Sequence, residues 1–179
     1  MTICIAMLRG INVAQKWIGM ERLRATFETL GLSEIRTYVQ SGNVVFQTKQ
    51  GSLARLSKDI TEQIRRDFDF DVPVLIRTLE EMEEIVASNP FVKDKEIDHS
   101  KLHVTFLAEA PATATVRGLE PLASKSERFR VLGREVYLYC PDGYGRTKLS
   151  NNAIERKLSL IGTTRNWRTV NALLEMAQT

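Results

Sequence analysis

The order of strand-like and helix-like patterns in residues 1–78 constrains the fold of this chain more than any other feature of its sequence. Residues 2–8 form an apolar, β-branched run of strand length. Two later segments place their apolar residues on one helical face, and Ser52 stands where the second of these helices would be capped. The helical segments lie near 20–30 and 53–68, and further strand-like runs lie at 35–40, 44–48 and 72–77. The predicted order is strand, helix, strand, strand, helix, strand, which is that of a ferredoxin-like unit.

A similar order recurs after a third helix and a charged linker. Thr78 and Glu81 have the spacing of a capping box, which predicts that the third helix begins there. The elements that follow are a strand, a weak helical segment interrupted at Pro121, two strands and a helical segment, near residues 101–108, 111–123, 126–132, 134–140 and 148–162. The repetition lies in the order of elements rather than in matching letters.

We therefore expect an α+β fold made of two ferredoxin-like (βαββαβ) halves with mixed or antiparallel sheets. The expected division is residues 1–78 for the first half, 79–99 for a connecting helix and linker, and 100–179 for the second half with a C-terminal helix.

The hairpin of the second half also predicts its own register. If Gly133 and Arg134 form a two-residue turn, Val131 lies opposite Val136 on an aliphatic face. Because side chains alternate along a strand, the other face carries arginines and tyrosines, namely Arg128, Arg130, Tyr137 and Tyr139.

Composition and charge set broad limits on function. The chain of 179 residues has a net charge of +3, but residues 125–179 hold 10 Lys and Arg against 5 Asp and Glu. A basic C-terminal third favours phosphate-bearing partners. Cys4 and Cys140 show no metal or redox spacing and fit small buried hydrophobes. We expect a cytoplasmic protein with no metal, no cofactor and no membrane segment.

Four motifs in order resemble one bacterial family. They are LRGINV after the first strand, TYVQSGNVVF across the first hairpin, NPF after the third helix, and TTRNWRTV near the end. The chain is similar over its whole length to the family called domain of unknown function 1697. The resemblance implies a cytosolic α+β protein with two related halves, and it brings no activity with it. The family usually has a Gly-Gly pair after GINV, where this chain has Ala14 and Gln15.

Two candidate binding loops lie in the first half. Arg9 and Asn12 follow the first strand, where an arginine and backbone N–H groups can be aimed at an anion. Ser41 and Asn43 flank the glycine of the first hairpin turn. The alternative is that all four are ordinary turn residues that hold the two loops in place.

Three further candidates lie in the second half. Lys148 ends the glycine-containing loop 143–148, which loosely resembles a phosphate-cradling loop, although Thr147 alternatively caps the next helix. Arg165 and Asn166 lie in the stretch GTTRNWRTV, in which we interpret Gly162 as the stop of one helix and Thr164 or Asn166 as the cap of the last. The functional hypothesis is that Arg165 and Asn166 meet Arg9 and Asn12 in one anion pocket.

Three classes of function remain open. The first is binding of a phosphorylated or otherwise anionic small molecule or nucleotide at the Arg and Asn loops. The second is nucleic-acid binding on the Arg and Tyr sheet face, with bases stacked on tyrosines, which the modest net charge disfavours. The third is an enzyme of unknown reaction that uses the same loops, for which the sequence shows little acid–base equipment. The oligomeric state is left open.

Overall fold

The structure of the chain is a computed structural model that describes residues 1–179. It contains two compact units. Unit 1 comprises Met1–Glu83 and Ala172–Thr179, and unit 2 comprises Glu84–Asn171. The last eight residues therefore group with unit 1 rather than with the second half, and the Nη1 of Arg36 donates a hydrogen bond of 3.1 Å to the Oγ1 of Thr179 within that unit.

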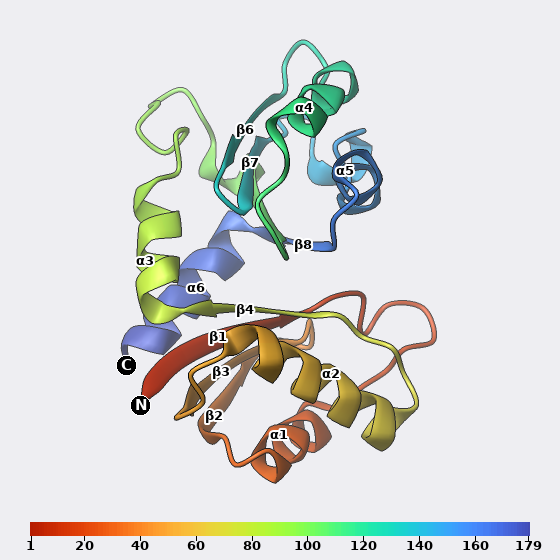
Figure 1. Ribbon diagram of the computed structural model, residues 1–179. Helices are drawn as coiled ribbons and strands as arrows, with labels where there is room; N and C mark the ends of the chain where they lie inside the picture. The colour runs from red at the N-terminus through yellow and green to blue at the C-terminus, as the bar shows by residue number, and fades with distance from the viewer. The chain divides into compact units, whose positions relative to one another are not determined.

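Unit 1 is a four-stranded antiparallel sheet with two helices on one face (Figure 1). The sheet order is β2-β3-β1-β4, in which β1 pairs with both β3 and β4 and β2 pairs with β3. The elements are β1 (Thr2–Leu8), α1 (Met20–Thr29), β2 (Ser33–Tyr38), β3 (Asn43–Thr48), α2 (Leu53–Phe68) and β4 (Val74–Thr78). The predicted element order is confirmed, with most boundaries within two residues.

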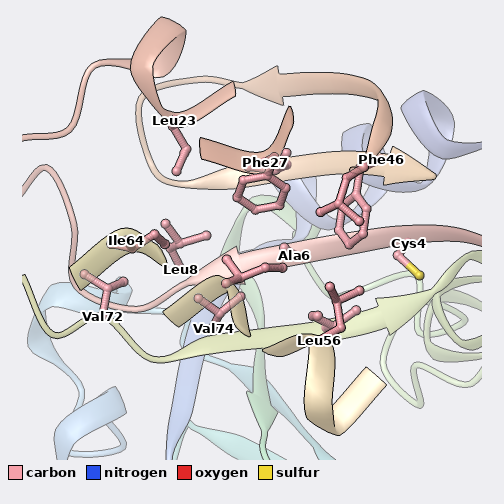
Figure 2. Packing of buried hydrophobic residues seen from close by; sticks show 14 of the residues in the cluster. Cys4, Ala6, Leu8, Leu23, Phe27, Phe46, Leu56, Ile64, Val72 and Val74 are labelled. Atoms are coloured by element: carbon pink, nitrogen blue, oxygen red, sulfur yellow. The ribbon is translucent and has the colours of Figure 1, made fainter. Parts of the chain in front are cut away.

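The core of unit 1 lies between this sheet and the two helices (Figure 2). Phe27 of α1 and Phe46 of β3 meet edge to face, with ring centroids 5.4 Å apart. The α2 stripe predicted from periodicity is buried at Leu56, Ile60 and Ile64. Ser52 caps α2, since its side chain accepts a hydrogen bond from the backbone N–H of Arg55.

Unit 2 repeats the same topology. Its sheet order is β6-β7-β5-β8, with every neighbouring pair antiparallel. The elements are β5 (Leu102–Leu107), α4 (Thr113–Val116), a 3-10 helix (Arg117–Leu122), β6 (Arg128–Leu132), β7 (Glu135–Tyr139), α5 (Asn151–Leu158) and β8 (Gly162–Asn166). The α+β class with two ferredoxin-like halves is therefore confirmed, and both sheets are antiparallel throughout.

The predicted hairpin register of unit 2 is confirmed. Val131 lies opposite Val136, and Arg130 lies opposite Tyr137. The core on the helix side of this sheet includes Val136 and Leu138 of β7 together with Ile154 and Leu158 of α5. The aliphatic alternation of β7 thus packs under α5, as its period predicts.

Each unit's last strand continues directly into a helix. Strand β4 ends at Thr78, and α3 (Leu79–Ala87) begins with the next residue. The capping box is confirmed, since Thr78 N–H donates to Glu81 Oε2 at 2.9 Å and Glu81 N–H donates to Thr78 Oγ1 at 3.1 Å. Strand β8 ends at Asn166, and α6 (Trp167–Gln178) follows it at once. None of the helices combines the length and apolar character needed to cross a bilayer.

The interpretation of Gly162 as a helix stop was wrong. Helix α5 ends at Leu158, and Ser159 makes the left-handed turn that ends it, with φ of 54°. Gly162 instead opens β8, opposite Leu107 of β5. A Cβ at Gly162 would lie 3.2 Å from the carbonyl oxygen of Phe106, so the glycine permits a close approach of two strands.

Candidate functional site

The loop after β1 is tied to the first hairpin turn by Asn12. Its Nδ2 donates to the carbonyl oxygen of Gln40 at 2.5 Å, and its Oδ1 accepts from the N–H of Ile18 at 2.8 Å. The backbone N–H of Arg9 donates to the carbonyl of Pro73 at 2.9 Å. These bonds give Asn12 a structural role as a clamp between two loops.

The turn residues Ser41 and Asn43 bond to each other. Asn43 is fully buried, and its Nδ2 donates to Ser41 Oγ at 2.6 Å. Gly42 lies between them at φ of 72°, and its carbonyl accepts from the N–H of Leu8 at 2.9 Å. The turn is therefore bonded to the end of β1 through Gly42 and to the loop after β1 through Gln40 and Asn12.

These same loops hold strained backbone and exposed apolar side chains. Val39 adopts φ of 49°, which is rare for a β-branched residue, and its side chain is exposed. Ala14 adopts φ of 55° in the loop that also exposes Trp17. The left-handed conformation at Ala14 explains why glycine would suit that position.

Arg165 and Asn166 end β8 in unit 2. The Nη1 of Arg165 donates to Thr163 Oγ1 at 2.7 Å and to the Thr164 carbonyl at 3.0 Å, and burial lowers the pKa of the guanidinium to about 10. Asn166 caps α6, since its Oδ1 accepts from the N–H of Thr169 at 2.8 Å. Arg9 belongs to unit 1 and Arg165 to unit 2, and the hypothesis that they share one anion pocket stays a prediction.

A half-buried polar network, which no sequence motif indicates, holds the loop before α5. Tyr144 stacks on His103 of β5 with ring centroids 4.7 Å apart, and its hydroxyl accepts from the N–H of Asn151 at 2.8 Å. The side chain of Asn151 accepts from Thr164 Oγ1 at 2.9 Å and donates to the Gly162 carbonyl at 3.0 Å. Burial lowers the pKa of His103 and raises the pKa of Tyr144.

This anchored loop carries Lys148 to the edge of a cavity. Ser150, rather than Thr147, caps α5 by accepting from the N–H of Ala153 at 3.3 Å, while Thr147 Oγ1 accepts from the N–H of Leu149. The cavity of unit 2 measures about 350 Å³, and its lining residues are Pro121, Leu122, Ala123, Ser124, Glu127, Asp142, Arg146 and Lys148. Lys148 is thus the predicted site residue that lines this cavity, and Arg146 joins it there.

The lining of the cavity carries equal numbers of positive and negative side chains. Two cations, Arg146 and Lys148, share its lining with two carboxylates, Glu127 and Asp142. Neither cation forms an ion pair with either carboxylate, whereas Arg128 pairs with Asp94 at 3.2 Å elsewhere in the unit. The carboxylates bond to neighbouring serines, since Glu127 Oε2 accepts from the N–H of Ser124 at 2.9 Å and Asp142 Oδ2 accepts from Ser126 Oγ at 3.3 Å.

Other reactive side chains are buried in the fold. Burial raises the pKa of the Cys4 and Cys140 thiols to about 11, so both remain protonated near neutral pH. Both cysteines are free and buried, as their surroundings in the sequence predict. Tyr137 is also buried, and its hydroxyl donates to the carbonyl of Ile85 at 2.8 Å.

Fold and site together define a protein of two ferredoxin-like units with a charged cavity in the second unit. A family model described as a protein of unknown function, DUF1697, matches residues 1–137, and the chain belongs to this family. Among solved structures, it is similar to the conserved bacterial protein SP0830 from Streptococcus pneumoniae, with a TM-score of 0.77 and 22% sequence identity over 98% of each chain. A comparison with curated proteins gave no match.

Proposed function

We propose that this protein binds a small anionic molecule, a phosphate monoester in the first place, in the cavity of unit 2 through Arg146 and Lys148. The observation that carries the proposal is the presence of two cations on a cavity of about 350 Å³ that has an apolar wall. This volume is at the lower end of the roughly 300–1,000 Å³ typical of small-molecule sites. It suits a metabolite with a few carbons better than an extended polymer.

The two cations would divide the recognition of the anion. An arginine presents a planar fork of donors that matches phosphate oxygens, and a lysine adds a compact charge. The loop that carries both is held at Tyr144 by the stack on His103 and by the bond from Asn151. Because Arg146 and Lys148 lie two and four residues beyond this anchor, part of the cost of ordering the loop is met before ligand binds.

Nucleic-acid binding on the Arg and Tyr face of the second sheet is less well supported. The face contains Tyr137, which is buried with its hydroxyl bonded to a carbonyl, so its ring offers no stacking surface. Arg130 is exposed on β6 and remains a suitable test of this alternative.

A binding experiment separates these alternatives. We expect ethyl phosphate or a sugar phosphate at about a hundred times its Kd to raise the unfolding free energy by about 2.7 kcal/mol and the Tm by roughly 5–10 °C. Arg146→Gln and Lys148→Gln should remove most of this shift, and Arg130→Gln, an exposed arginine outside the cavity, should leave it unchanged.

Three results would count against the proposal. One is the absence of a Tm shift with any phosphate monoester, and another is an equal shift in the Arg146→Gln protein. The third is tight binding of an oligonucleotide that weakens steeply with salt and is lost in Arg130→Gln, which would favour the sheet-face alternative. Turnover of a phosphate ester in the same samples would instead indicate an enzyme.

A further inference from the structure

The charge arrangement of the cavity indicates more about its ligand than that it is anionic. Arg146 and Lys148 line the same small cavity as Glu127 and Asp142. No ion pair joins these cations to these carboxylates, so the cavity presents separate positive and negative groups to a ligand.

The carboxylates retain capacity for a ligand. Each is bonded through one oxygen to a serine near the cavity, Glu127 to Ser124 and Asp142 to Ser126. An ionised carboxylate has two oxygens with about four lone-pair sites. These bonds leave each carboxylate with acceptor sites for a donor on a ligand.

A purely anionic ligand would satisfy only half of this lining. A phosphate monoester neutralises Arg146 and Lys148 but brings its own negative charge toward Glu127 and Asp142. An ammonium group on the same molecule would offset that repulsion and donate charge-assisted hydrogen bonds to the carboxylates. A hydroxyl group would donate a hydrogen bond without offsetting the charge.

We infer that the ligand of this cavity is a zwitterion, a phosphorylated amine or amino acid, whose phosphate binds Arg146 and Lys148 and whose ammonium binds Glu127 and Asp142. Its short carbon chain would lie against the apolar wall of Pro121, Leu122 and Ala123. The inference rests on the proposed function, because it assigns the ligand class for the same cavity.

The test compares two probes of nearly equal size by calorimetry, O-phosphoethanolamine and 2-hydroxyethyl phosphate, which differ in an ammonium against a hydroxyl group. We expect the unmodified protein to bind the amine at least about tenfold more tightly, the size of one charge-assisted hydrogen bond. In the double variant Glu127→Gln and Asp142→Asn this ratio should fall to about one, while Glu109→Gln, an exposed acid outside the cavity, should preserve it.

The outcomes distinguish the two proposals. Equal Kd values for the two probes in the unmodified protein would overturn the zwitterion inference and leave phosphate binding standing. A preference for the amine that survives in the double variant would also overturn it. Absence of binding by either probe would overturn both proposals. Because the first comparison uses the unmodified protein, the inference stays testable even if the double variant does not fold.

Discussion

Replacement of Gly42 by alanine tests the contact between the hairpin turn and the loop after β1. Gly42 has φ of 72°, and a Cβ placed there would lie 2.6 Å from Ile11 Cδ1 and 2.8 Å from Leu8 Cβ. Distances this short require the neighbours to move. Gly10 is the matched control, because it has φ of 71° and no atom within 4 Å of the added Cβ.

The size of the effect follows from three contributions. The left-handed conformation costs an alanine roughly 1–2 kcal/mol, and overpacking a buried site costs roughly 1–3 kcal/mol. Reduced entropy of the unfolded chain returns roughly 0.4–1 kcal/mol. We expect Gly42→Ala to lower the unfolding free energy by about 3 kcal/mol and Gly10→Ala by about 1 kcal/mol, since only the first variant meets the steric contact.

Urea denaturation followed by far-UV circular dichroism measures both losses, and hydrogen exchange of the β1 amides reports on unit 1 alone. Ile11→Val removes the nearest methyl group, so it should cost less in the Gly42→Ala background than in the unmodified protein. Equal destabilisation by Gly42→Ala and Gly10→Ala would refute the argument, because the backbone conformation alone would then explain both.

Three further predictions concern single side chains. Tyr137→Phe removes the buried hydrogen bond to the Ile85 carbonyl and should lower the urea-derived unfolding free energy by about 1–3 kcal/mol; an unchanged value would show that this bond contributes nothing. Ala14→Gly replaces a residue held in the left-handed conformation, at φ of 55°, and should leave the unfolding free energy unchanged or raise it by up to about 1 kcal/mol. A clear decrease in Tm in a thermal melt would show that Ala14 is not strained. Burial lowers the pKa of His103 below its ordinary 6.5, so on acidification the unfolded state binds a proton at this residue before the folded state does. The unfolding free energy should therefore be highest above pH 6.5 and decrease as the pH falls below that value. His103→Gln should remove this part of the pH dependence, and coincident pH profiles of the two proteins between pH 5 and 8 would argue against it.

The parts of the fold that the sequence predicts are those encoded locally. The hairpin register follows from a two-residue turn and the alternation of Val131 and Val136 around it. The capping box follows from the side chains of Thr78 and Glu81, three residues apart. In each case residues near one another in the chain supply the whole signal.

Strand β8 is not predicted from the sequence, because its residues show neither the apolar run nor the alternation typical of a strand. GTTRN begins with glycine and ends with two polar residues, and its conformation comes from pairing with β5, where Thr164 lies opposite Thr105. From the sequence Gly162 resembles a helix stop. The reason for a glycine there is the close approach of Phe106, which is more than fifty residues away in the chain.

Only one residue that lines the cavity is among the site residues predicted from the sequence. Lys148 was identified from its glycine-containing loop. The other side of the cavity comes from the end of the 3-10 helix, at Pro121 and Leu122, and from Glu127 before β6. Nothing in the spacing of these residues indicates that they share a cavity, because they lie in irregular segments and at the ends of elements, where no sequence periodicity reports which residues meet.

The direct passage from strand to helix, at Thr78 and again at Asn166, means that the structural repeat includes one helix more than a ferredoxin-like unit. The repeated segment runs from β1 to α3 and again from β5 to α6, seven elements rather than six. A recombinant fragment that stops at Thr78 would separate that residue from Glu81 and sever a reciprocal pair of hydrogen bonds. A cut within residues 88–101, between α3 and β5, would keep that pair but would separate Ile85 from Tyr137 and Ala172–Thr179 from the rest of unit 1.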